Sequence, residues 1–133
     1  MRVDFYQLSG RFSDPLFVAT VLVGRAWPKA AKVAIVAPNE QLQILDKRLW
    51  SEPKGRFLPH GINQQNAPIL LAEDAPDSAD VLINLDPNAP LPGGRFERIL
   101  ELVPSDEQMR EKLRERWRAW KQRGAELNHH VLK

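Results

Sequence analysis

The C-terminal part of the chain carries arginine and tryptophan residues at spacings that could bind an acidic peptide. On a helical wheel at about 100° per residue, Arg110, Arg114 and Lys121 fall on one ridge. Trp117 borders this ridge. Guanidinium groups form charge-assisted hydrogen bonds with carboxylates, and an indole ring offers an apolar surface to an aromatic or proline side chain. The pattern therefore predicts a site that could bind a ligand with acidic groups next to an apolar group.

The same segment also fits an ordinary amphipathic helix. Its apolar side chains fall on one arc of the wheel and would face a core; they are Met109, Leu113, Trp117 and Trp120. The glutamates would then pair with arginines three residues later on a solvated face; these pairs are Glu111 with Arg114 and Glu115 with Arg118. The two interpretations differ in whether a second aromatic surface faces the basic ridge.

Trp50 is a candidate for that second surface. In the helix that contains it, Leu42, Leu45 and Leu49 form the buried stripe, and Trp50 projects roughly 110° from the centre of the stripe. An exposed tryptophan of this kind is often a binding residue. Alternatively, Trp50 packs beneath the following proline-rich loop with Phe57.

Metal binding and covalent catalysis find little support in the residue types. The chain has no cysteine, which excludes disulfides, thiolate nucleophiles and cysteine-ligated metal sites. His129 and His130 are adjacent, so their side chains point apart and chelate poorly, and His60 stands in a loop. No serine occurs in a G-x-S-x-G motif. We expect no metal, no cofactor and no catalytic residue.

The glycines do not form a phosphate-binding loop. The turn after the first predicted strand, Ser9 to Ser13, has one glycine, Gly10, and Gly93 and Gly94 precede a predicted strand rather than a helix. A Rossmann-type nucleotide-binding enzyme is the alternative function, and it would need a phosphate site at one of these glycines. Direct nucleic-acid binding through the Arg-rich helix is a second alternative, against which the interleaved glutamates argue.

Composition indicates one compact domain spanning residues 1–133, with 43% hydrophobic residues and a net charge of +2. Residues 1–104 carry 11 basic and 12 acidic side chains, whereas residues 105–133 carry 8 basic and 5 acidic ones. An anionic partner should therefore meet the C-terminal segment. The longest apolar run, Leu16 to Val23, is too short to span a membrane, and no secretory signal precedes it. These features predict a cytoplasmic protein without membrane contact.

Hydrophobic periodicity and turn residues predict the elements that position these side chains. Strands are expected at 3–8, 32–37, 69–72, 81–85 and 96–103, and helices at 14–27, from 38 to about 50, and from a cap at Ser105 to about 123. Residues 51–68 and 86–94 should be irregular, and residues 124–133 a helix stop followed by a tail. Alternating strands and helices predict an α/β fold with a mostly parallel sheet covered on both faces.

Four segments of the sequence resemble the chi subunit family of bacterial DNA polymerase III, in the family's order and spacing. They are LDKRLWSEPKGRFLPHGI (45–62), DVLINL (80–85), LVPSDE (102–107) and RERWRAWKQRGAELN (114–128). The resemblance implies a single Rossmann-like three-layer domain without a nucleotide-binding motif, which serves as a non-catalytic docking module. Two features depart from the common pattern: tryptophans replace frequent tyrosines at 117 and 120, and the loop 86–94 is proline-rich where a helical turn is expected.

The resemblance also implies partners. Family members bind the acidic C-terminal tail of single-stranded-DNA-binding protein, which ends in Pro-Phe and a free carboxylate. The arginines would meet the carboxylates and the other side chains would receive the phenyl and proline rings; the matching positions are Trp50, Val103, Arg110, Arg114 and Trp117.

Family members also pair with the small psi subunit, through which they reach the clamp loader, so their contact with DNA is mainly indirect. Phe57, Leu58 and Pro59 are a candidate part of the psi surface. Plain packing of this loop is the equal alternative.

Overall fold

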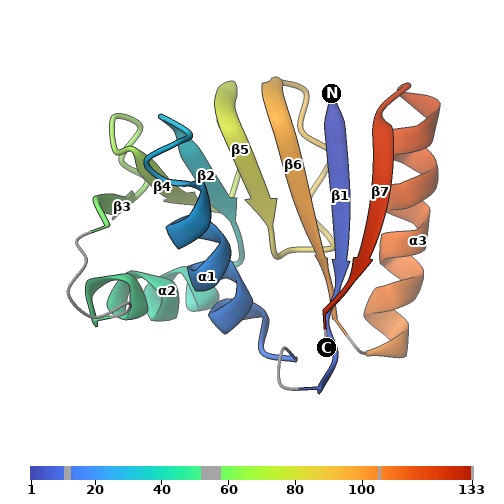
Figure 1. Cartoon of the computed structure of the whole chain (residues 1–133), viewed down its shortest axis with the longest axis horizontal. Helices are drawn as coiled ribbons and strands as arrows, with labels where there is room; N and C mark the ends of the chain where they lie inside the picture. The colour runs from blue at the N-terminus through green and yellow to red at the C-terminus, as the bar shows by residue number, and fades with distance from the viewer. Residues whose placement is uncertain (11–12, 52–57, 105, 133) are drawn as a thin grey trace.

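The computed structural model describes residues 1–10, 13–51, 58–104 and 106–132. Within these residues, seven strands and three helices follow one another in the order shown in Figure 1. They are β1 (Arg2–Gln7), α1 (Pro15–Ala26), β2 (Val33–Val36), α2 (Asn39–Ser51), β3 (His60–Ile62), β4 (Ile69–Ala72), β5 (Ser78–Asn84), β6 (Arg95–Val103), α3 (Glu107–Gln122) and β7 (Glu126–Val131). The strands form one sheet in the order β3-β4-β2-β5-β6-β1-β7, and each neighbouring pair is parallel.

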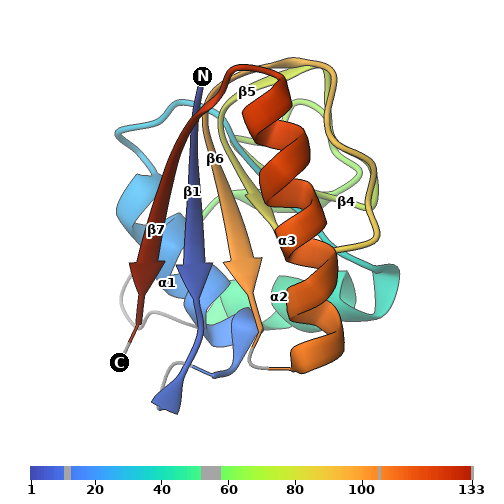
Figure 2. The ribbon, with the colours of Figure 1, turned by 90° about the vertical axis from the view of Figure 1, so that its right-hand side faces the viewer.

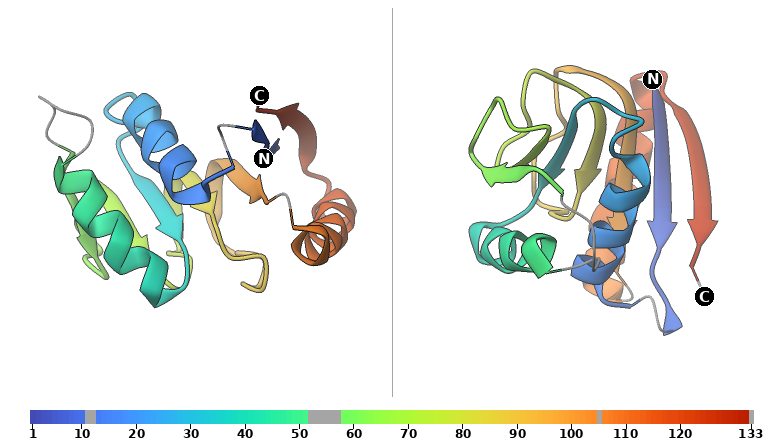
Figure 3. Two further views of the ribbon diagram at one scale, coloured as in Figure 1. Left: turned by 90° about the horizontal axis from the view of Figure 1, so that it is seen from below. Right: turned by 60° about the vertical axis from the view of Figure 1, so that its left-hand side comes forward.

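The helices cover both faces of this sheet. Helices α1 and α2 lie on one face, and α3 lies on the other (Figure 3). Alternate residues of β1 serve the two faces, so that Val3 and Phe5 pack against α3 while Leu8, just past the end of the strand, packs in the core of α1 and α2. The prediction of an α/β fold with a parallel sheet between two helical layers is confirmed.

Local sequence signals explain most of the element positions. Val33 to Val36 are all buried, as expected of a central parallel strand covered on both faces. Helix α1 begins after Asp14, whose carboxylate accepts a hydrogen bond from the Leu16 amide at 3.0 Å. Helix α3 is capped in the same way by Asp106, which accepts from the Gln108 amide at 2.9 Å. Ser105, the expected cap, lies outside the described residues.

The prediction of a C-terminal tail was wrong, because residues 126–131 form strand β7. This strand pairs in parallel with β1, with Arg2 opposite Glu126 and Tyr6 opposite His130. Its sequence, ELNHHV, is mostly polar because β7 is an edge strand, in which Leu127 is turned toward the α3 core and Val131 is exposed. Pairing of the two ends of the chain is a long-range contact that local patterns do not report. Likewise, β3 occupies part of the stretch expected to be irregular.

The loop between β5 and β6 contains neither a helix nor a strand, in line with its prolines. The prediction that residues 86–94 are irregular is confirmed; they contain one hydrogen-bonded turn, in which the Ala89 amide donates to the Asp86 carbonyl at 3.1 Å. At the end of the loop, Gly94 lies so close to the Asp77 carbonyl that a Cβ atom would clash with it. Close backbone approach therefore explains this glycine.

A buried carboxylate fastens the β6-β1-β7 end of the sheet. Asp4 is 0% exposed and accepts from Arg98 Nε at 2.6 Å and from His130 Nε2 at 3.1 Å, with Arg2 Nε also at 3.1 Å. Burial alone would raise the pKa of Asp4, but the hydrogen bonds from Arg98 and His130 and the charges of Arg98 and Arg2 together hold it below its usual value. The unfolded chain therefore binds a proton here more readily than the folded chain does.

We expect the free energy of unfolding to fall as the pH drops through the acid range below the ordinary aspartate pKa. Because the folded-state pKa of Asp4 is depressed, its contribution is present at neutral pH and is lost as the carboxylate protonates. The free energy of unfolding, measured by urea denaturation at several pH values between about pH 2 and pH 7, should depend on pH with a smaller slope in an Asp4→Asn variant. Glu115→Gln, at an exposed position, is the matched control and should keep the wild-type slope. Equal slopes for all three proteins would contradict this role for Asp4.

Candidate functional site

A groove with a volume of about 450 Å³ lies between α3 and the strands β1, β6 and β7. Figure 2 looks onto this side of the molecule, with α3 in front of the sheet and β7 at its edge. Its lining residues, which define the α3 groove, are Phe5, Gln7, Val103, Arg110, Leu113, Arg114, Trp117, Arg118 and His129. Gln7 and Val103 are the last residues of β1 and β6, so the groove opens at the carboxyl ends of these strands. Ligands of open α/β sheets commonly bind at that edge.

The floor of the groove is apolar. Phe5 and Trp117 meet edge to face, with ring centroids 5.0 Å apart and planes inclined by 61°. Val103 and Leu113 are buried beside them. Trp117 itself is only half-buried, so part of its indole surface remains open to a ligand.

One wall of the groove is cationic. Arg110, Arg114 and Arg118 stand four residues apart on α3 and share one face of the helix. Arg110 Nη1 lies 3.2 Å from Glu107 Oε1, and Arg114 Nη1 lies 2.9 Å from Glu111 Oε2. These pairs are largely exposed, and exposed pairs contribute little to stability. A carboxylate ligand can therefore compete with the glutamates for the arginines.

The expected pairing of glutamates with arginines is only partly present. The Glu111–Arg114 pair forms, whereas Glu115 and Arg118 make no ion pair with each other among the described side chains. Arg118 is exposed at the rim of the groove. It adds a third guanidinium to the two that the helical wheel had selected.

Four of the five residues assigned to peptide binding lie together in the α3 groove; they are Val103, Arg110, Arg114 and Trp117. Trp50 does not join them, because it belongs to α2, on the opposite face of the sheet (Figure 3). The expectation that Trp50 faces the basic ridge was therefore wrong. A wheel places a side chain around its own helix but does not say which face of the sheet that helix covers.

Five lining residues of the groove were not predicted from the sequence as part of the site: Phe5, Gln7, Leu113, Arg118 and His129. His129 was missed because its strand was taken for a tail, and its Nε2 lies 3.1 Å from Gln7 Oε1. Phe5 stood in a correctly predicted strand, but alternation alone does not tell which face points to the last helix.

Trp50 marks a second surface. Its side chain is 61% exposed, and its ring centroid lies 4.7 Å from that of His60. His60 connects α2 to β3, with Nδ1 2.6 Å from the Leu58 carbonyl and Nε2 3.2 Å from the Asp46 carboxylate. Because His60 is buried and bonded on both nitrogens, it provides a fixed support for the Trp50 ring.

The loop residues considered for a psi surface differ in accessibility. Leu58 is 1% exposed and packs in the core beneath α1 and α2, so its side chain has no area to offer a partner. Pro59 is half-buried. Phe57 lies outside the described residues.

No group of three or more histidine, aspartate or glutamate side chains among the described residues is placed to hold a metal ion. None of the helices in that part of the chain is both long and apolar enough to cross a membrane.

Comparison with known proteins gives a consistent result. Residues 1–128 match the family model for "DNA polymerase III chi subunit, HolC". A DNA polymerase III subunit chi of Pseudomonas aeruginosa is 34% identical over 98% of this chain and 96% of the relative. Subunits of the same name are 29% identical in Haemophilus influenzae, over 84% of this chain and 83% of the relative, and 27% identical in Escherichia coli, over 80% and 78%. The chain therefore belongs to the DNA polymerase III chi subunit family.

Proposed function

We propose that this protein is a non-catalytic accessory subunit of the DNA polymerase III holoenzyme that binds the acidic, Phe-ended tail of single-stranded-DNA-binding protein in the α3 groove. The observation that carries the proposal is the junction of an apolar floor, Phe5 and Trp117, with a wall of arginines. A peptide that ends in an aromatic residue carries an apolar ring and a free carboxylate on the same residue. The ring matches the apolar floor, and the carboxylate matches the arginines.

The fit of such a tail follows from the groove's composition. The phenyl ring of the last residue would lie against Val103 and the open face of Trp117. The terminal carboxylate and the preceding aspartates would accept hydrogen bonds from Arg110 and Arg114, displacing their glutamate partners. Arg118 extends the same wall for a further acidic residue.

Trp50 has a different role in this proposal. We assign it, with Pro59, to a second surface that joins the chain to psi and through psi to the clamp loader. Its support is a large aromatic side chain exposed on the α2 face and held by His60, since exposed aromatic residues of this kind dominate many protein interfaces. DNA contact remains indirect, through both partners.

Binding of the tail should weaken with salt. A fluorescently labelled peptide matching the tail should bind with a dissociation constant on the order of 1 μM, as measured by anisotropy. Arg110 and Arg114, which would bind the carboxylates, are accessible to solvent. Raising NaCl from about 0.05 M to 0.5 M shortens the screening length severalfold and should therefore reduce affinity about tenfold.

Two peptide controls separate the chemistries in this titration. A peptide without its last two residues should lose binding at every salt concentration, because it cannot fill the apolar floor. A scrambled peptide of the same charge should bind at most weakly. Affinity that does not change with salt would contradict the arginine contacts, and absence of binding by the folded protein would overturn the proposed function.

A further inference from the structure

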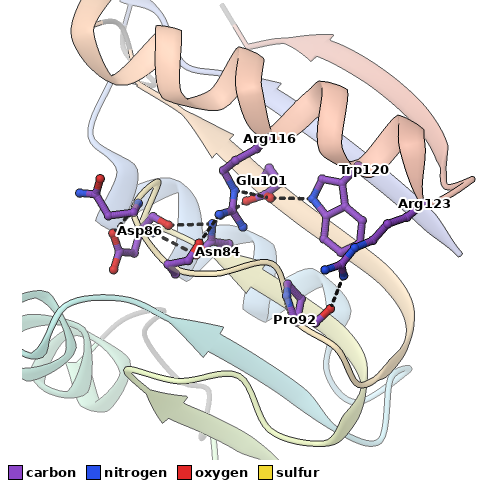
Figure 4. A network of polar contacts seen from close by, with 9 residues as sticks. Asn84, Asp86, Pro92, Glu101, Arg116, Trp120 and Arg123 are labelled. Atoms are coloured by element: carbon purple, nitrogen blue, oxygen red, sulfur yellow. Dashed lines mark hydrogen bonds and ion pairs between the residues drawn. The ribbon is translucent and has the colours of Figure 1, made fainter.

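A buried polar network lies between α3 and the sheet, outside the α3 groove (Figure 4). At its centre is Glu101 of β6, which is 0% exposed. Glu101 Oε2 accepts hydrogen bonds from Arg116 Nε at 2.8 Å and from Trp120 Nε1 at 2.9 Å. Its Oε1 accepts from Asn84 Nδ2 at 2.6 Å. Both oxygens of this carboxylate are therefore hydrogen-bonded to other side chains of the chain.

Arg116 extends the network to the loop between β5 and β6. Its Nη1 donates to the carbonyl of Ala89, in addition to the bond from Nε to Glu101. Near the end of α3, Arg123 Nη1 donates to the Pro92 carbonyl at 2.9 Å, as Figure 4 shows. One buried guanidinium thus joins a helix, a strand and a loop.

Stability alone does not account for a charged pair at this place. The side chain of Arg116 is 8% exposed and that of Glu101 is 0% exposed, and removing two such charges from water is costly. Apolar residues of similar volume often give equal or greater stability. A guanidinium bonded to a carboxylate does, however, fix the relative orientation of the two side chains. Its N–H groups lie in one plane and form good hydrogen bonds only over a narrow range of geometries.

Among the described residues α3 buries three side chains, which are Leu113, Arg116 and Trp120. Leu113 is held by apolar burial, which is non-directional, and Trp120 adds a single hydrogen bond, from Nε1 to Glu101. These two side chains alone would leave α3 some freedom to rotate or slide. The bonds of Arg116 to Glu101 and Ala89 oppose both movements.

In both β6 and α3, residues of the network lie next to residues that line the α3 groove. Val103 stands two residues after Glu101 on the same face of β6, and Trp117 follows Arg116 on α3. A rotation of α3 would carry Trp117 and Arg114 away from Val103. We propose that Arg116, held by Glu101, is the positioning residue that fixes the rotation and height of α3 and so aligns the walls of the groove. Arg116 itself does not line the groove.

The first test compares peptide affinity with stability, and this readout rests on the proposed function. An Arg116→Met variant should bind the tail peptide at least about tenfold more weakly at a temperature where circular dichroism shows it folded. The double variant Arg116→Met with Glu101→Gln removes the uncompensated buried charge. It should regain much of the lost thermal stability while its affinity stays low.

A matched control distinguishes a role of Arg116 in positioning α3 from a role in stabilising the fold. Leu45→Ala destabilises the core on the opposite face of the sheet and should leave the affinity within about twofold of wild type at the same temperature. Wild-type affinity in Arg116→Met, or affinity that returns together with stability in the double variant, would overturn the proposal.

A second readout does not depend on the peptide. The chain has four tryptophans, whose indole N–H signals can be resolved by NMR and assigned by single replacements with phenylalanine. The Trp117 signal should move in the double variant even without ligand, because its contact with Phe5 changes. An unchanged Trp117 signal would refute the positioning role. If wild-type protein bound no peptide, the proposed function would fail and this measurement would still decide on Arg116.

Discussion

Replacing Arg114 by alanine is expected to weaken binding of the acidic, Phe-ended peptide about tenfold. A hydrogen bond to a charged group contributes about 1.5–3 kcal/mol, and 1.4 kcal/mol corresponds to a factor of ten in affinity. Arg114 is half exposed and already paired with Glu111, so the lower end of this range applies. Adding Arg110→Ala should reduce the affinity further, because the two guanidiniums meet different carboxylates of the ligand. Anisotropy titrations at one fixed salt concentration measure both steps.

The matched control for this prediction is Trp50→Ala, which should leave peptide binding unchanged. Trp50 is an exposed aromatic residue, but it lies on the α2 face and outside the α3 groove. Glu111→Gln provides a second comparison, since it releases Arg114 from its internal partner and should strengthen binding slightly. Full binding by the Arg114→Ala variant would show that the α3 groove is not the peptide site. Loss of binding in the Trp50→Ala variant would show that the peptide contacts Trp50.

The sequence predicted the basic ridge and its aromatic neighbour because both depend on helical period alone. Arg110, Arg114 and Trp117 follow one another within two turns, so any regular helix brings them to one side. The same reasoning failed for Trp50, since the side of the sheet that a helix covers is decided by the path of the whole chain. Periodicity is local, whereas the choice of face is not.

The buried role of Arg116 escaped the wheel even though a signal was present. Arg116 lies at the edge of the apolar arc, about 20° from Met109 on the wheel, and an arginine there needs a buried partner. Glu101 offered the complementary signal, as a single acidic residue inside the otherwise apolar run ILELV. Matching a charge on a buried strand with an opposite charge on a buried helix stripe would have predicted the pair.

Strand β7 shows a different limit of local reasoning. Its polar sequence lacks the apolar pattern of the central strands because one edge is open and only Leu127 enters the α3 core. Its place is fixed by pairing with β1, which lies at the other end of the chain. Strand β7 contributes His129 to the α3 groove. Because β7 was predicted as a tail, the predicted site lacked this side of the groove.

The layered fold places the two proposed partner surfaces on opposite faces of one sheet. The α3 groove lies on the face of α3, and Trp50 lies on the face of α1 and α2. Neither partner would need to displace the other, so both could bind at once. This arrangement suits an adaptor, whose function requires that two contacts coexist.

Replacing Trp50 by alanine should therefore abolish stable association with psi. Exposed tryptophans that anchor an interface contribute about 2 kcal/mol or more, which corresponds to at least about thirtyfold in affinity. His60 supports the ring from beneath and remains in place in the variant, so the loss should reflect missing contact area rather than a disturbed backbone. Co-purification of the two subunits, followed by titration of the purified pair, measures the effect.

The control for this experiment is Ile44→Ala, another exposed apolar residue of α2. Ile44 lies six residues before Trp50, so it projects from a different side of the helix and should retain psi. The Trp50→Ala variant should still bind the acidic peptide with wild-type affinity, because the α3 groove is intact. Retention of psi at wild-type yield by Trp50→Ala would refute the assignment of this surface. Loss of psi in both α2 variants would instead place the interface along the whole exposed side of the helix.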